Sequence, residues 1–500
     1  MSANGSKREL LAPVSPARTT KSPRVDASRK SLCNTSDFDS IVSQLHLLGQ
    51  EHICSLENFD GNHPVFKQLQ ELDIARSVGH FQSANLASAA EKSLESFAPV
   101  SSVLDLASFS NNSCGIKAIK AGQVAAVIMS GGQGTRLGYA GPKGMYNLGM
   151  PSQKTIFQLH IEKVLKARSL FGAAEDGTLP SIPIYIMTSN LNHVIIQDFF
   201  EENNYFGYPA QDVVFFEQGV EPSYTFDGKI IIESSHSLSL APDGNGGIYR
   251  ALQYSGCIED MHRRGVEHLH IYGIDNVLTT ALDPAFLGAC IEKNAECGNK
   301  VVWRAHKSEK VGVTAELHGR MHILEYSELP PDLADAEDAH GKLLFGAANI
   351  CNHYLSVSFL TDTVLPSLSA VYHVAKKKIP YYDIATQRIV APAQVNGIKL
   401  EMFIFDVFPL AKRWVVVEGQ REDEFAPVKN APGADQVQNI IHKTICKVKV
   451  FNGLILKSAN DSCLSVILCI CSYTGLSGHG TGAAECAGPA VAPTRRCPVG

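Results

Sequence analysis

The chain has 500 residues, which is long enough to bury more than one hydrophobic core. Apolar residues make up 45% and charged residues 19%, an ordinary composition for a soluble protein. The net charge of −6, from 44 basic and 50 acidic residues, gives no electrostatic basis for general binding to nucleic acids or membranes.

The compartment is predicted from what the sequence lacks. No apolar run reaches the roughly 18 residues of a membrane span, and the N-terminus has no h-region of a secretory signal. Of the 13 cysteines, those before residue 446 are scattered singly and the rest crowd 446–500, and neither set has the paired spacing of a zinc site. We expect a cytoplasmic protein with free, mostly buried cysteines.

The first quarter of the chain is predicted to carry no chemistry. Residues 1–36 are rich in Ser, Pro and basic residues, which predicts a disordered basic tail. Residues 37–120 are predicted to form an N-terminal, mainly helical region, because Ile41, Leu45 and Leu48 recur near helical spacing.

From 121 to 435 short apolar runs alternate with helix-length segments such as 152–171. This alternation predicts an α/β fold with a largely parallel sheet covered on both faces. Ligands of such sheets bind outside the carboxyl ends of the strands. The runs taken as strands are 124–129, 182–187, 213–216, 268–274, 301–303 and 403–408.

The first apolar run leads into a glycine loop, 130–138 (SGGQGTRLG), followed by Pro142-Lys143-Gly144. Glycines let backbone N–H groups approach a ligand closely, and successive N–H groups form an anion-binding concavity. The loop has neither the G-K-[ST] of a P-loop nor the third glycine of a dinucleotide fingerprint. It is either a polyphosphate-binding loop or a tight strand–helix connection without a ligand.

The stretch GGQGTRLG…PKGMYNLGMPSQKTIFQ strongly resembles the signature of eukaryotic UDP-N-acetylglucosamine pyrophosphorylases, with Met129-Ser130 in place of the usual Leu-Ala. The resemblance continues in order along residues 40–435. It implies a Rossmann-like nucleotidyltransferase (GT-A-like) fold, with a mixed, mostly parallel sheet and flanking helices, and a catalytic domain over 121–435.

The resemblance also implies a nucleotide site. The motifs FFEQG (215–219) and LAPDGNGGIYRAL (240–252) match the family's uridine- and nucleotide-contacting segments, and NGIKLEMF (396–403) supplies a lysine near phosphate. Arg136, Lys143 and Lys399 are the implied catalytic residues, because fixed cations neutralise phosphate charge. The implied nucleotide-binding residues are Gly131, Gly132, Gly134, Thr135, Arg136, Lys143, Gln218, Gly244 and Lys399.

A metal site and a sugar site are implied in the same way. Asp275 follows the apolar run 268–274 and resembles the family's metal-binding aspartate, suited to Mg²⁺ with Mn²⁺ as an alternative. Asp406 is either a second metal ligand or a structural residue. The implied sugar-binding residues are Asn245, Gly312, Glu325, Tyr326, Asn349 and Lys429, and Ala348 stands before Asn349 where the family has Gly.

Residues 436–500 depart from the family. A Cys- and Gly-rich tail replaces the small C-terminal domain that family members have, and we interpret it as the product of a shifted frame or retained intron. If the tail is genuine, the apolar run 463–471 favours aggregation.

The implied reaction joins UTP and N-acetylglucosamine 1-phosphate to give UDP-N-acetylglucosamine and pyrophosphate. The sugar phosphate attacks the α-phosphorus in line, and positioning and charge neutralisation supply the catalysis. UTP and an N-acetylhexosamine 1-phosphate are the expected partners, with neither nucleic acid nor membrane, while protein partners are unknown. The alternatives are a UDP-glucose or broad UDP-sugar pyrophosphorylase, and an inactive nucleotide-sugar-binding isoform with a mis-spliced C-terminus.

Overall fold

The computed structural model describes residues 37–89, 97–109, 113–150, 152–368 and 372–429. Both predicted tails, 1–36 and 436–500, lie outside the described residues, and the division of the chain into domains stays a prediction. Within the described ranges no helix combines the length and apolar character that a membrane crossing requires.

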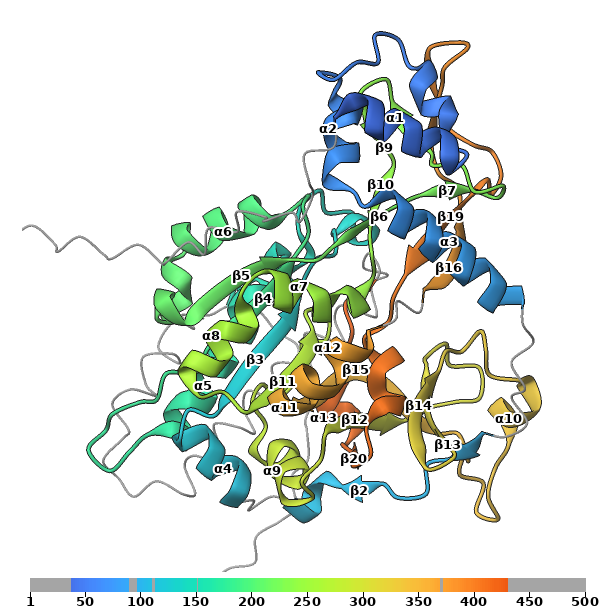
Figure 1. Ribbon diagram of the computed structural model, residues 1–500. Helices are drawn as coiled ribbons and strands as arrows, with labels where there is room; N and C mark the ends of the chain where they lie inside the picture. Colours follow the sequence, from blue (N-terminus) through green and yellow to red (C-terminus); the bar gives the residue numbers. More distant parts are fainter. Residues whose placement is uncertain (1–36, 90–96, 110–112, 151, 369–371, 430–500) are drawn as a thin grey trace, which may run out of the picture. The chain divides into compact units, whose positions relative to one another are not determined.

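A mixed sheet is the framework of the described chain (Figure 1). β15 pairs antiparallel with both of its neighbours in this order, and every other neighbouring pair is parallel. The predicted fold class, a mostly parallel mixed sheet with flanking helices, is confirmed. The strand order is β2 (Leu104–Asp105), β20 (Trp414–Glu418), β12 (Cys297–Trp303), β15 (Ala347–Ser356), β11 (His268–Gly273), β3 (Val124–Met129), β4 (Ile184–Thr188) and β5 (Val213–Glu217).

A short antiparallel extension branches from this sheet. β13 (Val313–Leu317) pairs with β15 and with β1 (Ala98–Pro99) and β14 (Arg320–Leu324). This extension leads into α10 (Pro331–Asp335).

The burial of the central strand β3 on both faces accounts for its continuous apolar sequence. All six of its residues are buried. Successive side chains of a strand point to opposite faces, so Ala126 and Ile128 enter one hydrophobic core while Val127 and Met129 enter the other. A strand covered on both faces has no polar position.

Helices cover both faces of the sheet. One core packs α4 (Ser113–Lys120), α5 (Ile156–Gly172), α6 (His193–Glu202) and α9 (Pro284–Glu292) against it. The opposite core packs α7 (Ile248–Tyr254), α8 (Cys257–Arg264), α11 (Val357–Phe359), η9 (Leu360–Val364), α12 (Leu365–Ser367) and η10 (Ile404–Leu410). The helix predicted over 152–171 is α5, which begins at Ile156 after Thr155 caps it.

A third core joins the N-terminal helices to short strands from the middle and the end of the described chain (Figure 1). The helices are α1 (Phe38–Leu47), η1 (Glu51–Ser55), α2 (Pro64–Glu71) and α3 (Ile74–Ala89). The strands are β7 (Tyr224–Thr225), β8 (Ile232–Ser234), β9 (Ser237–Leu238), β10 (Leu240–Pro242), β16 (His373–Lys377), β17 (Tyr381–Asp383) and β19 (Gly397–Glu401). β6 (Val220–Pro222) pairs with β10, and β18 (Arg388–Val390) pairs with β17.

One predicted strand is wrong. The apolar run 403–408 is the 3₁₀ helix η10, Ile404–Leu410. Asp406 Oδ2 accepts a hydrogen bond from the Phe403 N–H at 2.7 Å, which closes the first turn, and Pro409 lacks the N–H that a central strand needs. Local capping therefore outweighs the apolar pattern.

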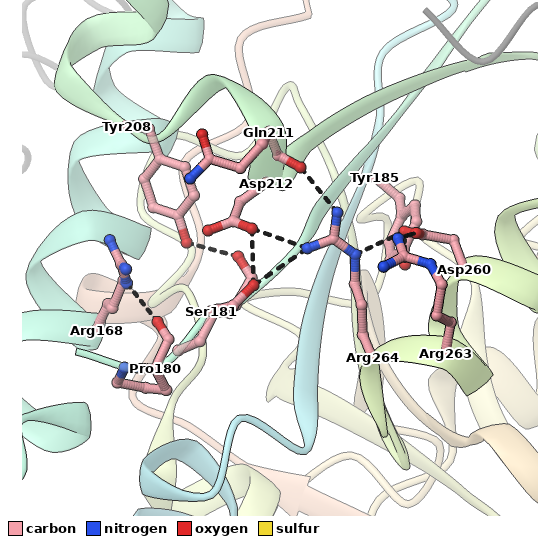
Figure 2. Close-up of polar contacts among 11 residues, drawn as sticks. Arg168, Pro180, Ser181, Tyr185, Tyr208, Gln211, Asp212, Asp260, Arg263 and Arg264 are labelled. Atoms are coloured by element: carbon pink, nitrogen blue, oxygen red, sulfur yellow. Dashed lines mark hydrogen bonds and ion pairs between the residues drawn. The ribbon is translucent and has the colours of Figure 1, made fainter. Parts of the chain in front are cut away.

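A polar cluster fastens the edge of the sheet where β4 and β5 begin. Figure 2 shows Arg264 of α8 between Asp212 and Asp260, to which it donates at 2.8 and 2.9 Å. Arg264 also reaches the Gln211 carbonyl at 2.8 Å and Ser181 Oγ at 3.1 Å. The cluster joins α8 to the segments that enter β4 and β5, at the edge opposite the strands' carboxyl ends.

Candidate functional site

The glycine loop after β3 is closed on itself by backbone hydrogen bonds. Gly134 N–H donates to the Gly141 carbonyl at 2.9 Å, and Lys143 N–H donates to the Gly132 carbonyl at 3.2 Å. In the described part of the chain, the N–H groups of Gly131 and Gly132 donate to no protein acceptor. The loop is thus rigid while two of its donors remain available, as an anion-binding concavity requires.

Three parallel strands bring polar groups to this loop. The Gln218 amide, after β5, lies so close to Gly131 that a Cβ there would meet Nε2 at 2.6 Å. Asn192, after β4, donates from Nδ2 to the Gly131 carbonyl at 3.1 Å and accepts from Ser189 N–H at 2.7 Å. The structure therefore brings the predicted residues Gly131 and Gln218 together and adds Asn192.

Two predicted cations flank the loop. Arg136 lies on η4 (Thr135–Leu137), and Lys143 begins η5 (Lys143–Met145). The side chains of Thr135 and Arg136 are exposed, and that of Lys143 is half-buried. Within the described ranges, no side-chain hydrogen bond or ion pair joins Arg136 or Lys143 to another residue. Their charges are available to a bound anion.

Two backbone hydrogen bonds join the second glycine loop, 243–247, to the residues between β19 and η10. Met402 N–H donates to the Asp243 carbonyl at 2.8 Å, and Gly246 N–H donates back to the Met402 carbonyl at 2.9 Å. Gly244 has φ 90°, and a Cβ on it would meet Met402 N at 2.7 Å. The Asn245 Oδ1 accepts from Ile404 N–H at 3.0 Å, so Asn245 orients η10.

Asp243, which precedes this loop, is a buried carboxyl that the sequence did not single out. It is 5% exposed, and its Oδ1 has no hydrogen-bond partner among the described residues. Burial, with a further contribution from the charge of Glu221, raises its pKa to about 7. Asp243 is therefore a carboxyl group that titrates near neutral pH and immediately precedes Gly244 and Asn245 in the chain.

Lys399 lies on β19 beside a histidine that the sequence analysis missed. β19 pairs antiparallel with β16, where Ala375 is opposite Lys399 and His373 is opposite Glu401. Directly opposed residues share a face and alternate residues of a strand do too, so Lys399 and His373 lie on the same face. His373 Nε2 donates to Asp406 Oδ1 at 2.9 Å. Because both oxygens of Asp406 accept protein hydrogen bonds, its structural interpretation is favoured over a metal ligand.

Asp275 follows β11 next to the start of the glycine loop. β11 and β3 run parallel with Gly273 opposite Met129, and Ile274 N–H donates to the Met129 carbonyl at 3.1 Å. The helix α5 holds this turn from one side, through His160 Nε2 on the Ile274 carbonyl at 3.1 Å and Lys163 Nζ on the Thr279 carbonyl at 3.0 Å.

The donor set around Asp275 fits a magnesium ion that arrives with phosphates. No group of three or more His, Cys, Asp or Glu residues in the described ranges could hold a metal by itself. Mg²⁺ is usually held by one or two carboxylates together with substrate phosphates and waters. A single carboxylate at the carboxyl end of a strand, beside an anion loop, meets that requirement.

The predicted acceptor residues surround Cys351 of β15. Burial, with the charge of Asp275 as the next cause, raises the pKa of the Cys351 thiol to about 12, while Lys429 acts in the opposite direction. Burial and the neighbouring Glu328 raise the pKa of Glu325, against Lys429 and His373. The backbone supports the same grouping, because Val428 N–H, next to Lys429, donates to the Asp275 carbonyl at 2.9 Å, and Asp275 and Cys351 both lie against Gly273.

The backbone around Glu325 is held by the other predicted sugar residues. A Cβ on Gly312 would meet Glu325 Oε1 at 3.0 Å, so a larger residue there would push that carboxylate aside. Asn349 N–H donates to the Gly312 carbonyl at 2.8 Å, and its Oδ1 accepts from Cys351 N–H at 3.1 Å. Asn349 is thus held in place although Ala348 replaces the family's glycine. Tyr326 is 52% exposed.

The predicted site residues therefore form three groups. The first glycine loop and Gln218 make one group, and the cluster of Asp275, Glu325 and Lys429 makes another. The second glycine loop, with Gly244 and Asn245, and Lys399 of β19 form the third, around the residues between β19 and η10. The sequence analysis missed Asn192, although it follows an apolar strand as Asp275 does. His373 had no comparable signal, because only the pairing of β16 with β19 brings it to the site.

A cavity among the described residues lies elsewhere. It measures about 740 Å³ and is lined by Lys117, His262, His268, Arg413 and others, around the start of β11. None of the predicted site residues lines it. The cavity therefore belongs to the amino edge of the sheet and is unrelated to the site built above.

Known proteins resemble this chain over most of the described region. The sequence profile of the UTP–glucose-1-phosphate uridylyltransferase family matches residues 81–446. A human protein named UDP-N-acetylhexosamine pyrophosphorylase-like protein 1 is 45% identical over 325 residues, which are 64% of this chain and 63% of that protein. The chain thus spans less than two thirds of the length of that relative.

Two further matches cover more. A Schizosaccharomyces pombe protein named probable UDP-N-acetylglucosamine pyrophosphorylase is 38% identical over 411 residues, 80% of this chain and 86% of that protein. The crystal structure of the Trypanosoma brucei uridine diphosphate N-acetylglucosamine pyrophosphorylase superposes with a TM-score of 0.71 at 29% identity, covering 83% of this chain and 85% of that one. The chain belongs to the UTP–glucose-1-phosphate uridylyltransferase family, and its relatives there include eukaryotic UDP-N-acetylglucosamine pyrophosphorylases.

Proposed function

We propose that this chain is a uridylyltransferase that forms UDP-N-acetylglucosamine and pyrophosphate from UTP and N-acetylglucosamine 1-phosphate. One observation carries the proposal. The anion loop at Gly131, with the Gln218 amide beside it, follows β3. The neighbouring strand β11 leads to Asp275, and Glu325 and Lys429 lie near that residue. A nucleoside triphosphate site and a sugar-phosphate site can therefore share one edge of the sheet.

In this proposal the glycine loop holds the triphosphate. The available N–H groups of Gly131 and Gly132 bind phosphate oxygens, and Arg136 and Lys143 neutralise the charge that develops on departing pyrophosphate. Gln218 pairs with the uracil edge, because an amide both donates and accepts. Asn192 keeps the loop in this conformation through the Gly131 carbonyl.

The sugar phosphate lies on the Asp275 side. Glu325 accepts hydrogen bonds from the sugar hydroxyls, Tyr326 donates to the sugar, and Lys429 binds the phosphate of the sugar, while Lys399 binds the phosphates of the nucleotide. The attacking oxygen is already anionic, so positioning the two anions replaces a general base. Asp275 would hold Mg²⁺, which supplies Lewis-acid stabilisation of the phosphoryl oxygens when bound.

The names of the relatives favour the amino sugar. The S. pombe and T. brucei proteins carry N-acetylglucosamine in their names, and the human relative carries N-acetylhexosamine. An N-acetylhexosamine 1-phosphate is therefore the proposed acceptor class, and N-acetylgalactosamine 1-phosphate is its second member. The UDP-glucose alternative has no comparable support among these names.

A pyrophosphate-release assay with the full chain tests the proposal. With UTP and Mg²⁺, N-acetylglucosamine 1-phosphate is expected to react at least about 10-fold faster than glucose 1-phosphate, because unpaired polar groups in the acetamido subsite penalise the smaller sugar. Arg136→Ala should lower kcat about 100-fold, the loss typical of one charge-stabilising donor. The matched control Arg388→Ala removes an exposed arginine of β18 and should leave kcat unchanged. Equal rates with glucose 1-phosphate would overturn the choice of sugar.

A further inference from the structure

Residues 421–428 form a strap that lies along the turn bearing Asp275. The strap consists of α13 (Arg421–Glu424) and the four residues after it. Val428 N–H donates to the Asp275 carbonyl at 2.9 Å. Asn276 holds the same strap with both ends of its amide, accepting from Ala426 N–H at 3.0 Å and donating to the Glu424 carbonyl at 2.7 Å.

The strap is anchored from beneath by one buried carboxylate. Glu424 is 5% exposed. Its Oε1 accepts from Thr280 Oγ1 at 3.2 Å, and its Oε2 accepts from Lys300 Nζ at 3.3 Å. Lys300 is fully buried on β12 and also reaches Asp283 Oδ2 at 2.5 Å. Burying both charges of this ion pair costs desolvation free energy, so the pair need not stabilise the fold. It instead favours one position of the strap over others.

The residue that follows the strap is Lys429. Its charge acts on both Glu325 and Cys351, whose neighbour is Asp275. Lys429 directly follows Val428, whose N–H is bonded to the Asp275 carbonyl, so the strap brings this lysine to the acceptor cluster. The ammonium group sits on a flexible stem, so its position depends on where the backbone of the strap is held.

We propose that Glu424, held by Lys300 and Thr280, is a positioning residue for the acceptor. It fixes the strap on the Asp275–Asn276 turn and so sets the distance of Lys429 from the sugar phosphate. Glu424 touches neither substrate, and its effect is transmitted through Asn276 and Val428. This inference rests on the proposed function for its kinetic consequence, but the tether itself is a property of the chain.

The kinetic test compares two matched removals of a buried negative charge. Glu424→Gln should raise the KM for N-acetylglucosamine 1-phosphate about 10-fold and leave the KM for UTP within twofold, because the strap carries Lys429, whereas His160 and Lys163 of α5 still hold the turn that bears Asp275. Asp212→Asn removes a buried carboxylate paired with Arg264 at the opposite edge and should leave both KM values within twofold. Equal KM shifts for both substrates in Glu424→Gln, or none, would overturn the proposal.

A milder variant covers the case in which Glu424→Gln folds poorly. Thr280→Val removes only the hydroxyl that donates to Glu424 and keeps the volume of the side chain. It should shift the same KM in the same direction by about threefold, the effect of one modest hydrogen bond. If Thr280→Val folds and neither it nor Glu424→Gln changes the KM for N-acetylglucosamine 1-phosphate, the proposed positioning role of Glu424 is wrong.

A readout without catalysis separates the two proposals. Hydrogen exchange at the N–H groups of Ala426 and Val428 should be at least 10-fold faster in Glu424→Gln than in wild type, and unchanged in Asp212→Asn, because local opening sets exchange. If wild type releases no pyrophosphate with any sugar phosphate, the proposed function fails while exchange still decides the tether. Unaltered exchange at both amides would remove the positioning role of Glu424.

Discussion

Gly131 and Gln218 lie in direct contact, although β4 separates the two strands, β3 and β5, that they follow. A Cβ on Gly131 would meet the Gln218 Nε2 at 2.6 Å. The contact ties the anion loop after β3 to the amide after β5. The end of a side chain can move more cheaply than backbone, so a methyl group at Gly131 would displace the amide rather than unfold the loop.

Gly131→Ala is therefore expected to weaken nucleotide binding. We expect the KM for UTP to rise at least about 10-fold, the cost of one lost hydrogen-bonded contact to the base. In a double-mutant cycle, Gly131→Ala should add little to Gln218→Ala, because both remove the same contact. Fully additive effects on the KM would show that the two residues act separately.

Asp243 predicts a pH dependence of stability. Its pKa of about 7 in the folded chain lies above its ordinary value of 3.8, so the folded state binds the extra proton between these values. The stability that protonation of Asp243 contributes is fully present below about pH 4 and is lost as the pH rises through 7. The loss amounts to about 4 kcal/mol of unfolding free energy.

The measurement compares urea unfolding of wild type and Asp243→Asn from pH 4 to pH 8. The charges that face Asp243 are Glu221 of β6, Arg250 of α7 and Arg76 of α3. The variant should gain stability relative to wild type as the pH rises, whereas Glu202→Gln, at an exposed carboxylate of α6, should run parallel to wild type. A constant difference between wild type and Asp243→Asn would contradict the prediction.

We expect Arg264→Ala to lower the free energy of unfolding strongly without changing catalysis (Figure 2). Arg264→Ala leaves Asp212 and Asp260 without their common cation. Breaking the pair with Asp212, whose side chains are only 14% and 4% exposed, is expected to cost about 3 kcal/mol. The matched control is Arg263→Ala, because Arg263 also pairs with Asp260 but its side chain is 68% exposed, and exposed pairs contribute about 0–1 kcal/mol. Thermal unfolding measures both, and similar losses would refute the distinction.

Cys351 is expected to resist alkylation. With a pKa of about 12, its thiolate fraction at pH 8 is on the order of 1 in 10,000, against about a quarter for an ordinary thiol. Peptide-resolved mass spectrometry after iodoacetamide treatment should give a rate about 1,000-fold slower in the native chain than in guanidinium. Comparable rates in both states would show that Cys351 is not shielded beside Asp275.

The sequence by itself determined the strands of the nucleotide half and the edge at which they end. Val124–Met129 had to be a buried strand because it has no polar residue, and Asp275 had to lie at a carboxyl end because it follows such a strand. The order of the motifs indicated the family, which the comparisons confirm. The roles of the site residues stay predictions.

Only the tertiary structure decided which residues act together. His373 reaches Asp406 through the register of β16 and β19, and Glu424 reaches Thr280 and Lys300 from more than a hundred residues away. The apolar run at 403–408 became a 3₁₀ helix because Asp406 caps it. Hydrophobic periodicity and the ends of strands are encoded locally in the chain. Buried polar pairings form only where packing excludes water, so that each group must find its partners within the protein.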